Sequence, residues 1–229
     1  MNSSFPKFIF NNLDSYDDLG IVIKEMSPIT LPERDVESIQ VEGSNRILHI
    51  DKGGFLKIKV KIKCILWDIT KLDTLKGLFK SLGEIEFLDN PGRKYKCRNI
   101  NQIDFSRLNG LTNVREFTLN FELEPIAYGI EQSITFSESG SFSINGTENS
   151  NPTITVTGTG TLTLNGINVQ FLETGITLDC ENMEAYANVT SKNDKVILDE
   201  FPYLSPGINN LTIPNTITSV TITYCERWL

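Results

Sequence analysis

The feature that most constrains the fold of this chain is a run of strict alternation in its second half. From Thr153 to Leu164, threonine occupies every odd position, and isoleucine, valine, leucine or glycine occupies every even one. A period of two is typical of a strand with one buried face. Gly158 and Gly160 interrupt the apolar row and predict either two strands or one kinked strand. We expect this ribbon to pack on its apolar face and to leave its hydroxyl face for solvent or a partner.

The rest of the second half is divided into short segments of the same kind. Turn dipeptides separate these segments and lie at Asn145-Gly146, Asn165-Gly166, Thr174-Gly175 and Pro206-Gly207. No stretch after Pro125 has the apolar spacing of a helix. About seven closely spaced strands without a helix predict a β-sandwich.

The first half mixes strands with one helix. Residues 57–64 alternate lysine with apolar residues, which predicts a half-buried strand. Its lysine face is interpreted as solvated surface or as protection against edge-to-edge pairing. Residues 70–83 place leucines on one face of a helix, with Thr70 and Asp73 as a capping box and Gly83 as its end. A strand that contains Phe117 to Leu123 is expected to end at Pro125.

The charge is distributed unevenly along the chain. Up to Pro125 there are 18 Lys and Arg against 18 Asp and Glu, whereas beyond it 3 basic residues stand against 11 acidic ones. The net charge of −8 therefore lies in the second half. Together with the change in strand pattern, this shift predicts two domains, residues 1–130 and 131–229.

The same composition argues against several classes of partner and location. An acidic chain lacks the basic footprint of a nucleic-acid-binding protein. No apolar run approaches the roughly 20 residues of a membrane-spanning helix. The first residues hold no basic segment followed by a long apolar one, so we expect the protein to be made and assembled in the cytoplasm.

Few residues in the sequence could carry catalysis. His49 is the only histidine, so zinc ligation by several histidines is excluded and a catalytic triad would rest on this residue alone. The four cysteines have no CxxC spacing and are interpreted as buried free thiols. No phosphate-binding glycine motif or EF-hand spacing occurs. We expect a protein that is not an enzyme and needs no metal or cofactor, although the scattered carboxylates leave a glycosidase pair open.

The aromatic residues of the second half leave two interpretations open. They are Phe142, Phe171, Tyr186, Phe201, Tyr203, Tyr224 and Trp228. Such residues form the core of a sandwich, or they stack on sugar rings where they are exposed. The sequence favours the core.

Two stretches far apart in the sequence carry a resemblance. The first holds Gly20, Pro32-Glu33-Arg34 and Val41-Glu42-Gly43, followed by a polar turn and a strand pair. The second holds Phe201-Pro202-x-Leu204-x-Pro206-Gly207-x-Asn209 and, at the end, Arg227-Trp228-Leu229. With the helix and strand between them, these motifs resemble the distal tail protein (Dit) family of long-tailed phages of Gram-positive hosts. The resemblance covers nearly the whole chain.

The resemblance implies a fold and a place in an assembly. It implies a first β-sandwich with one helix, related to tail-tube proteins, which assembles into a homo-hexameric ring. It implies a second, galectin-like β-sandwich on the outside of the ring. Such a ring joins the tail tube to the tail-tip (tail-associated) protein at the virion tail tip or baseplate, and it often holds receptor-binding proteins. No nucleic-acid contact and no membrane are required. Some relatives carry an inserted carbohydrate-binding module, for which the second half of this chain has no room.

Four residues are candidates for oligomer or docking contacts. They are Arg34, Arg46, Pro206 and Gly207. The alternative for Arg34 is a solvated ion pair with its acidic neighbours. For Pro206-Gly207 the alternative is a type II turn that only prepares the next strand.

Three functions are therefore weighed. The first is a hexameric tail hub without catalysis. The second is a carbohydrate-binding module for host cell-wall polysaccharide. The third is a wall-degrading hydrolase, and it has the least support.

Overall fold

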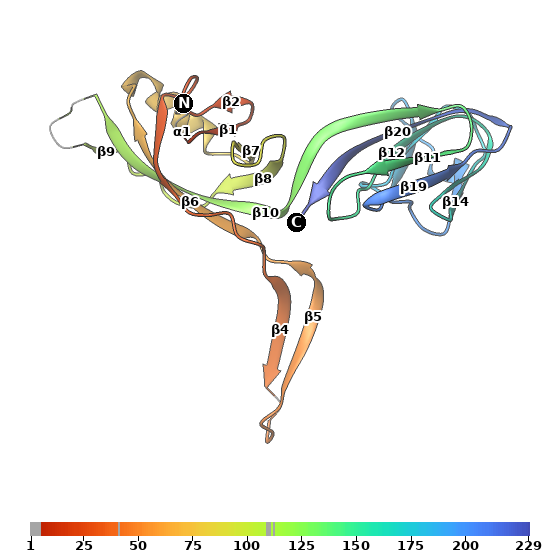
Figure 1. Ribbon diagram of the computed structural model, residues 1–229, viewed down its shortest axis with the longest axis horizontal. Helices are drawn as coiled ribbons and strands as arrows, with labels where there is room; N and C mark the ends of the chain where they lie inside the picture. Colours follow the sequence, from red (N-terminus) through yellow and green to blue (C-terminus); the bar gives the residue numbers. More distant parts are fainter. Residues whose placement is uncertain (1–5, 41, 109–110, 112) are drawn as a thin grey trace. The chain divides into compact units, whose positions relative to one another are not determined.

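The computed structural model describes residues 6–40, 42–108, 111 and 113–229. Figure 1 shows a chain built almost wholly of β-strands, so the expected mainly-β class is confirmed. The chain divides into two compact units, Met1–Ala127 with Leu229, and Tyr128–Trp228. Val41, one of the residues behind the family resemblance, lies outside the described residues. Within the described part, no helix is long and apolar enough to cross a membrane.

The first unit contains most of the longer connections and the α-helix of the described chain. Its elements are β1 (Phe8–Phe10), β2 (Leu13–Asp14), β3 (Ile21–Met26), β4 (Arg34–Gln40), β5 (Ile47–Phe55), β6 (Ile58–Leu66), η1 (Ile69–Lys71), α1 (Leu72–Leu78), β7 (Gly83–Phe87), β8 (Lys94–Asn99) and β9 (Ser106–Arg107). Strand β10 (Arg115–Phe136) begins in this unit and ends in the second. One sheet has the order β10-β8-β7-β1-β2, with β6 between β10 and β3.

This sheet curls so that β1 comes to lie against β10 across the core. Three steps separate β1 from β10, which corresponds to roughly 14 Å in a flat sheet. Even so, the ring centroids of Phe10 on β1 and Phe121 on β10 are 5.7 Å apart. Phe79, just after α1, fills the space between them, with its ring centroid 5.1 Å from that of Phe10. The first unit therefore encloses an aromatic core between two layers of strands and closes it with the helix.

The helix is shorter than the 70–83 expected from its leucines. Only Leu75 and Phe79 are buried, whereas Leu82 is 76% exposed. The expected capping box at Thr70 and Asp73 is wrong, because the Asp68 carboxylate accepts the hydrogen bond from the Thr70 N–H at 3.0 Å. Gly83 belongs to β7, where a Cβ would overlap the Phe10 ring.

The expectation that Pro125 ends its strand is also wrong. Strand β10 continues for 22 residues, from Arg115 to Phe136. Its pairing with β6 stops at Leu123, opposite Ile58. Pro125 lacks an N–H, and it lies just past the point where that ladder would need one. The strand therefore passes through the proline without losing a hydrogen bond to β6.

The second unit consists of two sheets packed face to face. Its further elements are β11 (Gly140–Ile144), β12 (Thr153–Gly158), β13 (Gly160–Leu164), β14 (Ile167–Phe171), β15 (Ile176–Asp179), β16 (Glu184–Ala187), β17 (Thr190–Ser191), η2 (Asn193–Lys195), β18 (Val196–Leu198), β19 (Gly207–Thr212) and β20 (Ile217–Trp228). One sheet has the order β17-β16-β15-β12-β20-β10, and the other has the order β11-β19-β13-β14-β18.

The two glycines of the threonine ribbon carry the chain from one sheet to the other. Strand β12 ends at Gly158 and β13 begins at Gly160, and these strands lie in different sheets. Both glycines have positive φ, +119° and +135°, which residues with a side chain rarely adopt. Val156 and Leu162 then enter the same buried core from opposite sides. Of the two expected arrangements, two strands or one kinked strand, the structure has two strands.

On the outer face of the first of these sheets the hydroxyl groups bind one another. Thr155 and Thr177 Oγ1 are 3.1 Å apart, and Thr135 and Thr221 Oγ1 are 2.9 Å apart. Their strands β15, β12, β20 and β10 are neighbours, so these pairs cross the sheet. The hydroxyl face is thus a set of cross-strand pairs.

Candidate interaction surfaces

The first candidate surface is the hairpin formed by β4 and β5. These strands pair with each other and form a separate two-stranded sheet. Figure 1 shows the hairpin extending away from the rest of its unit. Nearly all its residues are exposed or half-buried, among them the apolar residues Val36, Ile39, Ile47, Leu48 and Ile50. An isolated two-stranded hairpin is marginally stable in water.

Three of these five apolar residues share one face with Glu37, whereas Val36 and Ile47 lie on the other face. Ile39 lies opposite Leu48, and Ile50 lies diagonally beside them, so these three side chains share a face. Their exposed fractions are 41%, 53% and 42%. We call them the apolar hairpin face. Three adjacent aliphatic side chains at this exposure are typical of a surface that another protein covers.

The opposite face of the hairpin carries the only histidine. Ser38 Oγ lies 2.9 Å from His49 Nδ1, as a cross-strand pair. Both residues are exposed, and Asp51 on the same face is bound elsewhere, by Arg34 and by the N–H of Gly53. This pair therefore joins the two strands of the hairpin.

Two of the predicted contact residues lie on this hairpin. Arg34 opens β4, and its guanidinium is 3.4 Å from Asp51 and 5.1 Å from the centre of the Phe55 ring. It therefore pairs across the hairpin and not with its sequence neighbours Glu33 and Asp35. Arg46 lies exposed in the turn, and its backbone N–H donates to Ser44 Oγ. Neither contact tests a role between subunits, which stays a prediction.

A groove of about 820 Å³ lies at the base of the hairpin. The segments just before β4 and just after β5 form its walls, and the N–H of Leu56 donates to the Glu33 carbonyl at 2.7 Å. Leu31 and Leu56 line the groove and are 74% and 45% exposed. Lys57 and Lys59 line it as well. Glu33 and Glu122 line it too, so the groove combines apolar side chains with charges of both signs.

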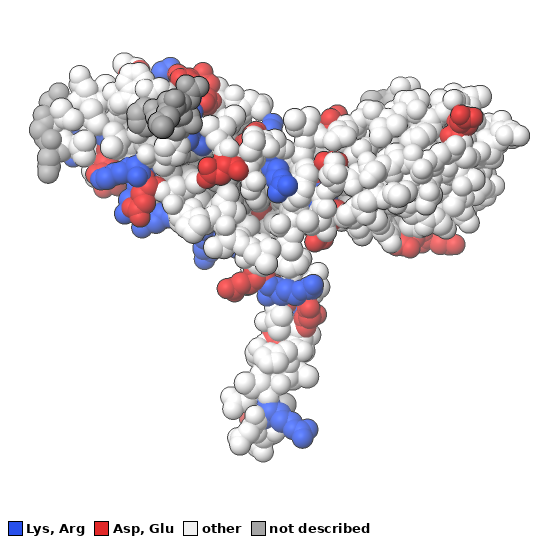
Figure 2. Space-filling view, in the orientation of Figure 1, with Lys and Arg blue, Asp and Glu red and all other residues white. Residues whose placement is uncertain are grey.

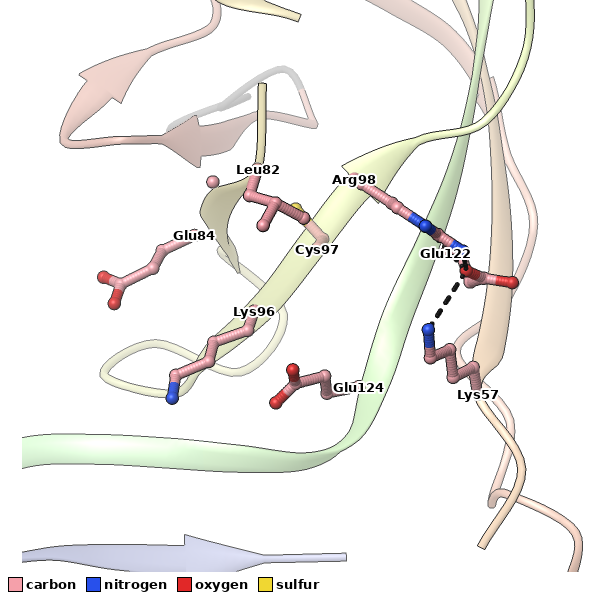
Figure 3. Close-up of a pocket in the computed structure, with 9 residues that line it drawn as sticks. Lys57, Leu82, Glu84, Lys96, Cys97, Arg98, Glu122 and Glu124 are labelled. Carbon is pink, nitrogen blue, oxygen red and sulfur yellow. Dashed lines mark hydrogen bonds and ion pairs between the residues drawn. The ribbon is translucent and has the colours of Figure 1, made fainter. Parts of the chain in front are cut away.

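A second pocket, of about 320 Å³, lies on the same unit and is shown in Figure 3. Its Glu122 carboxylate accepts two hydrogen bonds from Arg98, at 2.6 and 2.8 Å, and lies 3.4 Å from Lys57 Nζ. The bonds from Arg98, aided by Lys57, hold the pKa of Glu122 below its ordinary value. Burial raises the pKa of the adjacent Cys97 to about 12. This pocket therefore offers an occupied carboxylate and a protonated thiol, which is poorly suited to nucleophilic chemistry.

The other two predicted contact residues form an exposed loop on the second unit. Gly207 has a φ of +92°, close to the value that a type II turn needs after Pro206. The loop is held by Asn209, whose side chain is fully buried. Asn209 Nδ2 donates to the carbonyls of Ser205 and Gly207, and its Oδ1 accepts from the Ser205 N–H. The turn is thus rigidly presented, while a docking role for it stays a prediction.

The described residues hold no group of three or more His, Cys, Asp or Glu that could bind a metal ion. Sequence reasoning missed the apolar hairpin face and the groove at its base. Ile39, Leu48 and Ile50 look like core residues in the sequence, because nothing local shows that the hairpin leaves its sheet. The polar turn between two strand-like runs is a signal that does predict the hairpin itself.

The comparisons with known proteins bear on both units. Residues 144–228 match the family model of the SPP1 Dit proteins, described as the siphovirus-type tail component, C-terminal domain. The matched residues lie in the second unit, which is thus similar to a siphovirus-type tail component domain. The resemblance to the distal tail protein family is thereby confirmed.

The fold of the whole chain agrees with this family. It matches the crystal structure of the SPP1 Dit protein with a TM-score of 0.70 and 16% sequence identity. The match covers 99% of this chain and 100% of that one. That protein is described as a paradigm of the hub adsorption apparatus in phages that infect Gram-positive bacteria. The comparison with curated proteins finds no match. The chain therefore has a Dit-like fold, and its second unit is similar to a siphovirus-type tail component domain.

Proposed function

We propose that this chain forms a homo-hexameric ring at the distal end of a phage tail. The ring joins the tail tube to the tail-tip protein and gives receptor-binding proteins a place to attach. The likeness of its fold to the SPP1 hub protein supports the proposal. The observation that carries it is the exposed β4–β5 hairpin.

The hairpin needs a covering surface that its own unit does not supply. Its strands pair with no others, and the apolar hairpin face of Ile39, Leu48 and Ile50 is open to solvent. Burying such side chains against another chain contributes roughly 25 cal/mol per Å² of apolar surface removed from water. A neighbouring copy brings both the apolar contacts and a support for the two strands.

A ring is the arrangement that uses this feature on every copy. In a cyclic assembly each subunit presents one surface and receives a different one, so every hairpin meets a surface of the next subunit. The balance of 18 basic and 18 acidic residues up to Pro125 allows first units to pack closely without strong repulsion. The acidic second half is compatible with a place on the periphery, where its charges stay solvated.

We further infer that the chain works without catalysis. Its single histidine bonds to Ser38 on an exposed hairpin, and its pocket thiol, Cys97, is protonated at neutral pH. A carbohydrate-binding function has no specific support. Every Phe, Tyr and Trp of the second unit is buried or half-buried, so none presents the open ring face on which a sugar stacks.

The experiment is light scattering coupled to size-exclusion chromatography on matched variants. Ile39→Thr with Ile50→Thr removes apolar contact from the hairpin and keeps β-branched side chains in its strands. The control, Ile197→Thr with Ile208→Thr, makes the same changes on exposed strand residues of the second unit. We expect the wild type and the control to have six times the mass of one chain and the hairpin variant to be monomeric. A monomeric wild type at high concentration, or a hexameric hairpin variant, contradicts this account.

A further inference from the structure

The lysine face of β6 is a surface that the ring does not account for. Lys57, Lys59, Lys61 and Lys63, which we call the lysine strip, alternate with the buried residues Ile58, Val60 and Ile62. Strand β6 pairs with β3 on one side and with β10 on the other. The pairing with β3 covers only Ile62–Leu66, so the stretch of β6 around Lys59 is paired with β10 alone. Protection of this edge from pairing with another chain stays a prediction.

Two lysines in the middle of the strip form no ion pair within the described residues. Lys63 Nζ is 2.6 Å from Glu25, and Lys57 shares Glu122 with Arg98. Among the residues that the structure describes, Lys59 and Lys61 have no carboxylate within 4.0 Å. Two neighbouring ammonium groups are thus left to solvent or to a partner.

The strip runs into the groove at the base of the hairpin. Lys57 and Lys59 line this groove together with Leu31 and Leu56, which are 74% and 45% exposed. One end of the surface therefore offers apolar contact and the other offers positive charge. A partner that fits both parts has acidic residues followed by apolar ones.

We propose that the lysine strip and this groove dock an extended acidic segment of a partner protein. Alternate residues of an extended strand are about 6.7 Å apart, so carboxylates at every second position of the segment match alternate lysines of β6. Apolar residues at the end of the segment then cover Leu31 and Leu56. The inference goes beyond ring formation and does not depend on it.

The flanks of the strip favour a protein segment over a nucleic acid. Glu122 on β10 lies opposite Lys59, and Glu25 on β3 lies opposite Lys63. A duplex is wider than one strand and would bring its phosphates against these carboxylates. The exposed leucines of the groove likewise find no partner on a phosphate backbone. A single extended peptide lies between the flanks.

The test measures fluorescence anisotropy of a labelled peptide with the full-length protein at low salt. The peptide alternates glutamate with threonine and ends in two leucines. Lys59→Glu with Lys61→Glu reverses the central charges of the strip, and we expect it to weaken binding about tenfold or more. The control, Lys76→Glu with Lys80→Glu, changes the net charge by the same amount. These two lysines lie on and just after α1, which packs on the opposite face of the sheet. We expect the affinity of this control for the peptide to stay within twofold of wild type.

Several outcomes overturn the proposal. Equal weakening by both charge-reversal variants shows only a long-range effect of net charge. Equal binding of a peptide with lysine in place of glutamate removes the charge argument. Tighter binding of a short duplex DNA, with the same dependence on Lys59 and Lys61, assigns the strip to nucleic acid instead. Loss of self-association in Lys59→Glu with Lys61→Glu, measured by light scattering, assigns it to a second copy of this chain. Light scattering measures ring formation separately from peptide binding, so failure of the ring proposal and failure of the docking proposal can be told apart.

Discussion

Replacement of Asn209 by alanine tests whether one buried amide holds the Pro206–Gly207 loop. The Asn209 side chain is fully buried and takes part in four hydrogen bonds. Two of them tie Ser205 through both its N–H and its carbonyl, at 2.9 Å each, and another joins Asn165 Nδ2 at 2.7 Å. Asn209→Ala removes all four at once.

The magnitude follows from these bonds. Each contributes about 1 kcal/mol net, and a partner left buried without a bond costs more. Water can reach the exposed Gly207 carbonyl, so its bond is partly replaced. We therefore expect the free energy of unfolding of the second unit to fall by about 3 kcal/mol, which for a unit of this size lowers Tm by roughly 10 °C or more.

The assay is urea and thermal unfolding followed by the fluorescence of Trp228. Of the two tryptophans, Trp67 lies in the first unit, so a Trp67→Phe background leaves a signal from the second unit alone. The matched control is Asn210→Ala, because Asn210 is the next residue on β19 and is exposed. We expect this control to stay within about 0.5 kcal/mol of the parent. Equal stability of the two alanine variants would refute the reasoning.

Asn209→Asp adds a check on the direction of the hydrogen bonds. The aspartate places an oxygen where the Asn209 amide donates to the carbonyls of Ser205 and Gly207. Burial and these carbonyls disfavour the charged form, so the pKa of the new carboxyl is raised in the folded state. The loss of stability should therefore grow as the pH rises and should be smallest in acid. A loss that does not change with pH contradicts this arrangement.

Two further substitutions test other parts of the fold. A Cβ at Gly158 would lie 2.5 Å from the Thr216 carbonyl oxygen, whereas a Cβ at Gly175, which also has a positive φ, would meet nothing within 4 Å. We therefore expect Gly158→Ala to lower the free energy of unfolding by about 3 kcal/mol and Gly175→Ala by about 1 kcal/mol, measured by thermal unfolding. Equal losses in the two variants would contradict the crossover geometry. Because the pKa of Glu122 is lowered in the folded state, ionised Glu122 stabilises the first unit at pH values above 4.5, the ordinary pKa of a glutamate. This stabilisation is lost as the pH falls through the folded-state pKa. The loss of stability in Glu122→Gln should accordingly shrink below pH 4.5. Glu124→Gln, on the same strand face, serves as the control. If the loss of stability in Glu122→Gln is the same in acid, the Arg98 contact is not its cause.

Alternation in the sequence predicted the strands well, because it records which face is buried. Residues 57–64 correspond to β6, and the pattern around Gly158 and Gly160 predicted the break between β12 and β13. Short strands without such a pattern, such as β18, were not predicted. The mainly-β class therefore follows from periodicity, while the order of strands in each sheet depends on contacts between distant residues.

The errors arose where tertiary contacts overrule local signals. Leu82 continues the leucine stripe, but it is exposed and the helix ends at Leu78. Gly83 starts β7, where it packs against the Phe10 ring. Pro125 is a strong strand terminator only where the neighbouring ladder needs its N–H. Both outcomes depend on residues far away in the sequence.

The interaction surfaces could be predicted only in part. Arg34 and Arg46 were candidates for contacts from the sequence, and both lie on the hairpin. The exposure of Ile39 and Leu48 could not be predicted, because apolar residues in alternating strands indicate a core. Only the structure shows that the hairpin lacks a sheet to cover it.

The central claim is that copies of this chain close into a ring through the hairpin. Negative-stain class averages of the purified wild-type protein test it most directly. The account predicts closed rings with sixfold symmetry, which disappear in Ile39→Thr with Ile50→Thr. Separate particles of single chains at high concentration, or rings that persist in that variant, would contradict it.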